Sequence, residues 1–208
     1  MRLYHHPMSS NARRALMTAI HLELPLELAE VDLMNADDRR RLAELNPNGK
    51  VPVLADGDFL LWESCAIMQY LAEQVPGQTI YPSAPQARAD VNRWLFWAAQ
   101  HFAPAIGVLA WERAWKGMTG GGPADPLEEA RGERELHACA AVLDAHLARR
   151  SWLSGEDVTL ADFAVAAPLM YSEAVRLPLG QYAQIQAWFG RVRQLRAWQA
   201  TQVDLSVG

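Results

Sequence analysis

The sequence contains few cysteines and lacks a long apolar segment. Only two cysteines, Cys65 and Cys139, occur among its 208 residues. A disulfide framework or a cysteine-ligated metal cluster needs more cysteines at closer spacing, so both are excluded and buried free thiols are expected. No apolar run approaches the roughly 18 residues that cross a bilayer. The chain begins with the strand-like segment Arg2–His5 instead of a signal peptide, which favours a cytoplasmic protein with no membrane partner.

The sequence also has no excess of basic residues. It contains 19 Lys and Arg against 24 Asp and Glu, which gives a formal net charge of −5. The two arginine runs, 13–14 and 39–41, are short, and the second lies among carboxylates. Nucleic acid is therefore excluded as a partner, because phosphate binding needs a clustered basic face. With 50% hydrophobic and 21% charged residues, the chain is expected to fold compactly, and its length allows two domains.

The first 76 residues alternate between strand and helix patterns. A short strand at Leu3–Tyr4 precedes apolar residues at helical spacing over 12–20, and alternating leucines at 24–28 predict a second strand, parallel to the first through a right-handed crossover. After the charged segment 37–44 come two strands, 51–54 and 59–61, joined by a hairpin turn, and a helix that Pro76-Gly77 ends. The predicted order is βαβαββα, an α/β domain of the thioredoxin-like type over residues 1–76.

The rest of the chain shows only helical patterns. Residues 77–85 are rich in Pro, Gly, Gln and Ser and are predicted to be a linker. Residues 86–208 are predicted to be an all-α domain. The apolar stripes that predict its helices are Val91, Trp94, Leu95, Ala98 and Phe102; Leu136, Ala140, Leu143 and Leu147; and Ile185, Trp188, Phe189 and Val192.

The first strand-to-helix turn, residues 7–14, is where a thioredoxin-like fold places its chemistry. A dithiol oxidoreductase needs Cys-x-x-Cys here, and this turn has no cysteine, so thiol exchange by the protein itself is disfavoured. The hydroxyl of Ser9 or Ser10 can instead donate a hydrogen bond to an anion at the helix N-terminus. Ordinary N-capping of the helix by either serine is the structural alternative.

Four motifs in the same order resemble the glutathione S-transferase family. They are the run from Leu3 to Arg13, the segment Asn46–Leu54, the pair Glu63-Ser64 before Cys65, and the segment Thr159–Asp162 followed by Phe163-Ala164. The resemblance spans nearly the whole chain. It implies a glutathione transferase that acts in detoxification and uses glutathione as co-substrate. It also implies a homodimer with active sites near the subunit interface.

The resemblance also implies a role for five residues in holding glutathione. A cis Val51-Pro52 bond would turn the backbone groups of Val51 toward the peptide backbone of glutathione. Glu63 and Ser64 would hold the ammonium and carboxylate of the γ-glutamyl group. Lys50 would meet the glycine carboxylate, although a solvated surface lysine is the alternative.

Ser9 is predicted to donate to the glutathione thiolate, because it lies four residues before Arg13, as in the serine-using classes. Ser10 and Asn11 are rivals for this role under other alignments of the turn. The thiolate would attack a small hydrophobic electrophile in a second pocket, and no metal takes part. The candidates for that pocket are Met8, His101, Ile106, Trp111 and Trp115, with plain core packing as their alternative.

Two other functions remain open at this point. One is a glutathione-fold regulator that binds a partner without catalysis. The other is a glutathione-dependent cis–trans isomerase, because Ser9-Ser10 begins like the Ser-Ser-Cys motif of the zeta class, although Asn11 replaces the cysteine. Thr159 and Asp162 are predicted to form an N-capping box with a structural role only.

Overall fold

The computed structural model describes residues 1–205 and confirms the predicted βαβαββα order of the first part of the chain. Its sheet has four strands in the order β2-β1-β3-β4, with β1 parallel to β2 and antiparallel to β3, and β3 antiparallel to β4. The elements are β1 (Arg2–His5), α1 (Ser10–His21), β2 (Glu27–Glu30), α2 (Ala36–Leu45), β3 (Val53–Asp56), β4 (Phe59–Trp62) and α3 (Ser64–Glu73).

Strand β2 begins later than the alternating leucines predict. The N–H of Leu24 still donates to the carbonyl of Ala19, 2.9 Å away, so this residue closes the turn that follows α1. Pro25 follows and has no N–H to donate to a strand ladder. The ladder starts where the N–H of Glu27 donates to the carbonyl of Met1 at 3.1 Å.

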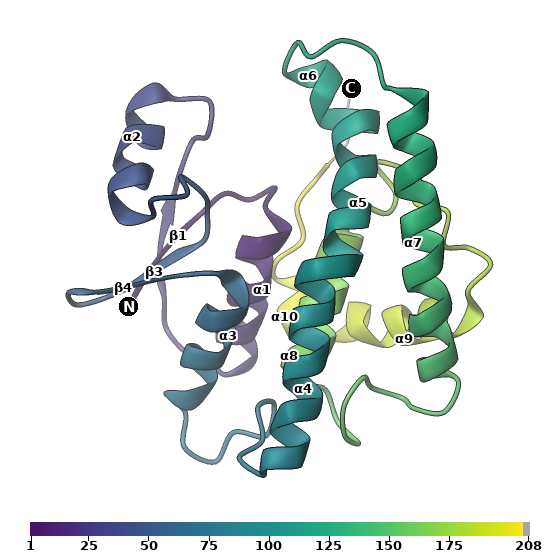
Figure 1. The fold of residues 1–208 in the computed structure, drawn as a ribbon. Coiled ribbons are helices and arrows are strands. Elements are labelled where there is room, and N and C mark those ends of the chain that lie inside the picture. The colour runs from purple at the N-terminus through teal and green to yellow at the C-terminus, as the bar shows by residue number, and fades with distance from the viewer. Residues whose placement is uncertain (206–208) are drawn as a thin grey trace. The chain divides into compact units, whose positions relative to one another are not determined.

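The two faces of this sheet pack against different helices (Figure 1). Leu3 and Leu54 are fully buried in one cluster with apolar residues of α1 and α3. Val53 points to the opposite face, where it is buried with Leu42 of α2. Side chains alternate between the faces of a strand, so neighbouring residues such as Val53 and Leu54 serve the two layers.

The register of the strands places three loops together at one edge of the sheet, the edge formed by the C-terminal ends of β1 and β4 and the N-terminal end of β3. Tyr4 of β1 lies opposite Val53 of β3, and Val53 lies opposite Trp62 of β4. Consequently the turn that follows β1, the loop that precedes β3 and the residues that follow β4 all leave the sheet at the same edge.

The structure divides the chain into two compact units. The first comprises Met1–Tyr81 and Arg196–Val203, and the second comprises Pro82–Leu195 with residues 204 and 205 of the described chain. The sequence assigned 196–203 to the helical part, whereas these residues pack within the first unit. The domain borders expected from the sequence, 1–76 and 86–208 with a linker at 77–85, stay a prediction. Residues 206–208 lie outside the described residues.

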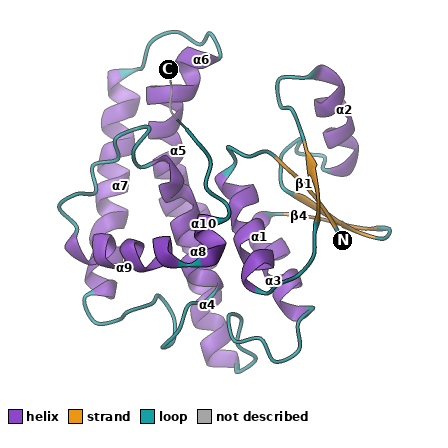
Figure 2. Cartoon of the chain, turned by 180° about the vertical axis from the view of Figure 1, so that it is seen from behind, coloured by secondary structure: helices purple, strands orange, loops and turns teal. Residues whose placement is uncertain are grey.

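The second unit consists of helices and loops in the described residues (Figure 2). All members of the predicted apolar stripes are buried except Phe189, which is half-buried. The helices are α4 (Pro85–Trp97), α5 (Ala103–Ala110), α6 (Lys116–Met118), α7 (Pro126–Leu147), α8 (Leu160–Ala166), a 3₁₀ turn at Ala167–Tyr171, and α9 (Ala183–Gln194), while α10 (Arg196–Gln199) belongs to the first unit.

Two π-helical turns interrupt the long helical stretch from Pro85 to Met118. The first is Ala98–Phe102, where the N–H of Ala103 donates to the carbonyl of Ala98. The second is Trp111–Trp115, closed by the N–H of Lys116 on the carbonyl of Trp111. Such turns insert one extra residue and rotate the side chains that follow, and they recur at functional sites.

The predicted capping box at the start of α8 is confirmed. Asp162 is fully buried, and its carboxylate accepts from the N–H of Thr159 at 2.9 Å and from the indole N–H of Trp188 at 2.9 Å. It also accepts from the N–H of Leu153 at 3.0 Å and from the hydroxyl of Thr159 at 3.2 Å. Burial raises the pKa of Asp162 to about 6, while these donors act to lower it. One carboxylate therefore ties α8 to α9 and to the loop before α8.

Arg13 anchors the end of the described chain to α1. Its guanidinium is buried, and it donates from Nε to Thr201 Oγ1 and from NH2 to the carbonyl of Trp198, both at 3.0 Å. The same group lies 3.7 Å over the Trp198 ring, which adds a cation–π contact. This residue therefore holds α10 against α1 within the first unit.

Candidate functional site

The turn between β1 and α1 presents a serine hydroxyl at the N-terminus of the helix. Ser9 is the N-cap of α1, with φ −89° and ψ 112°, and its Oγ accepts from the N–H of Ala12 at 3.2 Å. A hydroxyl has two lone pairs and one hydrogen, so this contact occupies a lone pair and leaves the hydrogen able to point elsewhere. Ser9 is half-buried. Ser9 can therefore cap α1 with a lone pair and donate its hydroxyl hydrogen to a ligand at the same time.

The two rivals of Ser9 take different places on α1. Ser10 is the first residue of the helix and is half-buried. Asn11 is exposed, and its Oδ1 accepts from NH1 of Arg14 at 2.8 Å. A guanidinium only donates, so the oxygen of this amide faces Arg14 and its NH2 group faces away.

The loop before β3 is built around a buried asparagine. Asn46 Nδ2 donates to the carbonyl of Lys50 at 2.6 Å, and Asn46 Oδ1 accepts from the N–H of Asn48 at 3.0 Å. The Val51-Pro52 peptide bond is cis, and both residues are buried, whereas the Lys50 side chain is exposed. Asn46 therefore shapes the segment that carries the three predicted binding residues.

The start of α3 carries the predicted acidic residue and serine. Glu63 is exposed and takes φ 74°, a left-handed conformation that is unusual for a residue other than glycine. Ser64 is buried, and its Oγ accepts from NH1 of Arg14 at 3.3 Å. This contact brings the start of α3 next to the first turns of α1.

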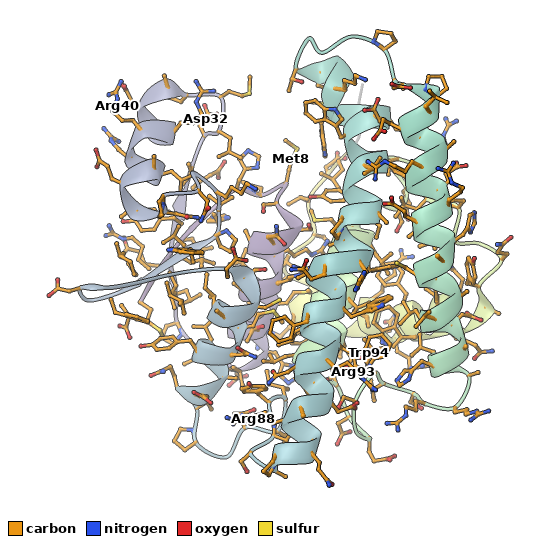
Figure 3. The ribbon with its side chains drawn as sticks, viewed as in Figure 1. Met8, Asp32, Arg40, Arg88, Arg93 and Trp94 are labelled. Atoms are coloured by element: carbon orange, nitrogen blue, oxygen red, sulfur yellow. The ribbon has the colours of Figure 1, made fainter. Side chains whose placement is uncertain are left out.

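The predicted electrophile-pocket residues differ in exposure. Met8 lies on the turn before α1 and is 36% exposed (Figure 3). Trp111 is 45% exposed, and His101 is also exposed, while Trp115 is half-buried with its ring 6.0 Å from that of Tyr171. Ile106 is fully buried in the helical unit. His101, Trp111 and Trp115 all lie in the two π-helical turns.

Both cysteines are free, and as whole residues they are partly exposed, so they are less buried than the sequence predicts. Cys65 is the second residue of α3, in the first turn of that helix, and is partly exposed. Burial raises the pKa of its thiol, and the charge of Arg14 partly offsets this effect. Cys139 on α7 is also partly exposed, and burial raises its pKa.

Metal binding and membrane insertion each require a particular arrangement of residues. Within residues 1–205, no group of three or more His, Cys, Asp or Glu is arranged to hold a metal ion. Among the same residues, none of the helices combines the length and hydrophobicity required of a membrane span.

Arg14 is the residue at this site that sequence reasoning missed. In the sequence it looks like one half of a short arginine pair with Arg13, yet its side chain is only 1% exposed and contacts both Asn11 and Ser64. The pattern contains a hint, because Arg14 falls between Ala12 and Ala15 on the buried face of a predicted amphipathic helix.

Comparisons with known proteins agree with the resemblance in the motifs. The family model described as glutathione S-transferase, N-terminal domain, matches residues 1–73, and the one described as glutathione S-transferase, C-terminal domain, matches residues 126–198. The chain is 34% identical to glutathione S-transferase GstB of Escherichia coli strain K12, over 89% of each chain. It is 31% identical to glutathione S-transferase 3 of Zea mays, over 97% of this chain and 92% of that protein.

A solved structure extends the likeness to the whole fold. The theta class glutathione S-transferase of Xanthomonas axonopodis pv. citri, crystallised with glutathione bound, is 30% identical to this chain. The two superpose with a TM-score of 0.87, covering 98% of this chain and 97% of the other.

Proposed function

The chain belongs to the glutathione S-transferase family and is a glutathione transferase, and from this premise we propose that it binds glutathione at the shared sheet edge and activates the thiol through Ser9. The observation that carries the proposal is the strand register, which gathers the Ser9 turn, the Val51-Pro52 loop and the Glu63-Ser64 pair at one edge. Transferase activity was the first of the three functions considered from the sequence, and it is confirmed.

Thiol activation is the chemical step assigned to Ser9. A free thiol has a pKa of about 8.5, and lowering it by two units requires about 2.7 kcal/mol of preference for the thiolate. The N-terminus of α1 supplies about 0.3–1 kcal/mol of this, and a hydrogen bond to a charged acceptor supplies about 1.5–3 kcal/mol. The Ser9 hydroxyl supports the larger contribution, because its lone pair is already engaged by Ala12 and its hydrogen is available to sulfur.

The reaction balances without a covalent bond between protein and glutathione. The thiol loses its proton to solvent, and the sulfur lone pair then forms a bond with an electrophilic carbon of the second substrate. In a substitution, the bond from that carbon to the leaving group breaks and its electron pair departs with the group. In an addition, the π bond of the activated double bond breaks, its electron pair moves away from the attacked carbon toward the activating group, and the neighbouring carbon then takes up a proton. Ser9 donates to the sulfur until the new bond removes its negative charge.

The rest of glutathione meets groups of matching charge. We assign its γ-glutamyl carboxylate to the Ser64 hydroxyl and the first N–H groups of α3, and its ammonium to the exposed carboxylate of Glu63. The backbone of Val51 pairs with the cysteinyl backbone of the ligand. Exposed Lys50 meets the glycine carboxylate.

The electrophile pocket is assigned to residues that retain exposed surface. His101 and Trp111 do so, Trp115 does so in part, and Met8 lies on the turn that carries Ser9. Ile106 is fully buried and offers no surface to a ligand, so it is not assigned to the pocket. A cytoplasmic location and the absence of nucleic-acid partners stay predictions.

Glutathione binding is tested by isothermal titration of the purified protein with reduced glutathione. We expect saturable binding in the wild type and loss of about tenfold or more in affinity in the double variant Glu63→Ala/Ser64→Ala, because both ends of the γ-glutamyl group lose a charged or hydroxyl partner. Circular dichroism verifies the fold of the variant. The absence of binding to wild type at millimolar glutathione would reject the proposal.

We also propose that two copies of the chain associate through β4. This strand is an outer strand of the sheet and pairs with β3 only. Its residues Phe59, Leu60 and Trp62 are 49%, 40% and 38% exposed. An edge strand with several exposed apolar side chains favours association with another protein surface. We expect the variant Phe59→Ser/Trp62→Ser to sediment as a monomer when the wild type sediments as a dimer. The variant Leu127→Ser serves as the control, since Leu127 is 79% exposed in the other unit. An equally stable dimer in the β4 variant would exclude this strand as the interface.

A further inference from the structure

A buried cation lies beneath the proposed γ-glutamyl site. Arg14 is 1% exposed, among the most deeply buried large side chains of the chain. An arginine is almost never fully buried unless its charge is paired or hydrogen-bonded, because desolvating the charge is costly. Here the same nitrogen, NH1, donates to Asn11 Oδ1 at 2.8 Å and to Ser64 Oγ at 3.3 Å. One guanidinium thus bridges the first turn of α1 and the first residue of α3.

Both acceptors of Arg14 are themselves groups that can donate. When Asn11 uses its oxygen for Arg14, its NH2 group is directed away from the buried guanidinium, on a residue that is exposed. When Ser64 uses a lone pair of its hydroxyl for Arg14, its O–H hydrogen donates elsewhere, and the neighbouring Cys65 thiol accepts it when no ligand carboxylate is present. Arg14 therefore sets the polarity of two neighbouring side chains in the same direction.

We propose that Arg14 is a positioning residue that turns the Asn11 amide and the Ser64 hydroxyl into donors for the carboxylate of the γ-glutamyl group. The proposal rests on the proposed function of this edge as the glutathione site. Arg14 acts through these two side chains and through its charge, which favours an anion bound above it. Asn11 then serves the carboxylate end of glutathione, a different role from the thiol contact considered for it from the sequence.

The neighbouring arginine provides a matched control. Arg13 is 4% exposed and also belongs to α1, but its guanidinium contacts Trp198 and Thr201. Removing either guanidinium disturbs a buried charge of the same helix. Only removal of Arg14 is expected to change the orientation of Asn11 and Ser64.

The first test compares Arg14→Met with Arg13→Met by titration with reduced glutathione and by steady-state kinetics. We expect Arg14→Met to weaken glutathione binding by ten- to a hundredfold and to raise the KM for glutathione more than it lowers kcat. Arg14→Lys, which keeps the charge, should recover part of the affinity. Arg13→Met should lower the midpoint of thermal unfolding while changing glutathione affinity less than threefold. Equal loss of affinity in both methionine variants, or wild-type affinity in Arg14→Met, would overturn the proposal.

A second variant tests the direction of the donors without touching the buried cation. Asn11→Asp keeps an oxygen for Arg14 and nearly the same shape, but places an acceptor where the amide NH2 was. Because Asn11 is exposed, we expect Asn11→Asp to fold, and to bind glutathione at least tenfold more weakly than wild type, whereas Asn11→Ala loses only a few-fold. Unchanged affinity in Asn11→Asp would show that this amide does not face the ligand. If the wild type itself fails to bind glutathione, the proposed function fails first, so the two failures are distinguishable.

Discussion

Replacing Ser9 by alanine should lower kcat/KM for conjugation by about 10- to 100-fold at pH 6.5, because the thiolate loses a charged hydrogen bond of about 1.5–3 kcal/mol. The pH profile should move in a defined direction. Without the donor, the pKa of the bound thiol rises toward the free value of about 8.5, so activity is retained at high pH and lost below it. Steady-state assays with a chromogenic electrophile at pH 6 to 9 measure both effects.

The same substitution also removes the N-cap of α1, so a second variant separates the two losses. Glycine is a tolerated N-cap that costs only a few tenths of a kcal/mol, whereas alanine costs about 1 kcal/mol. Ser9→Gly should therefore keep the stability that Ser9→Ala loses, while both lose the same activity. Ser10→Ala and Asn11→Ala should retain the wild-type pH profile. A shifted profile in Ser10→Ala with an unchanged one in Ser9→Ala would transfer the role to Ser10.

Replacing Asp162 by alanine should lower the free energy of unfolding by about 3–5 kcal/mol, because four donor groups around a fully buried carboxylate would lose their acceptor. Asp162→Asn should lose less stability than Asp162→Ala, since its amide oxygen can still accept from Leu153 and Trp188. It should still be less stable than wild type, because its NH2 group cannot accept from the N–H and hydroxyl of Thr159. Urea unfolding followed by circular dichroism and by tryptophan fluorescence measures these losses.

Asp157 is the matched control for this experiment. It lies in the same loop region but is exposed, so Asp157→Ala should change the free energy of unfolding by less than about 0.5 kcal/mol. The glutathione affinity of folded Asp162→Asn should equal that of wild type, since the residue belongs to the helical unit. A loss of less than 1 kcal/mol in Asp162→Ala would contradict the structural role.

The sequence predicted most of what depends on local patterns. The βαβαββα order, the parallel β1–β2 pair, the capping box at Thr159 and Asp162, and the helix start at Ser64 all follow from periodicity, turn residues and capping rules, which act over a few residues. The late start of β2 was missed, because alternation alone does not account for the missing N–H of Pro25.

Contacts between distant segments could not be predicted in this way. No spacing rule links Arg14 to Ser64, 50 positions away, or Arg13 to Thr201, 188 positions away. Two adjacent arginines look equivalent in a sequence, yet the geometry of a helix sends them to different partners. The π-helical turns were missed for a related reason, because an apolar stripe continues through them with only one extra residue.

The return of residues 196–203 to the first unit has a consequence for biosynthesis. The N-terminal 81 residues are synthesised well before the ribosome reaches Trp198 and Thr201. At about 5–20 residues per second, the delay is several seconds or more. During that interval the Arg13 guanidinium has not yet met the partners that bury it, so the nascent α1 helix exposes a cation and an apolar surface. The thioredoxin-like unit, although first in the chain, is thus completed last, and a stop codon shortly before residue 196 would impair the segment that is translated first.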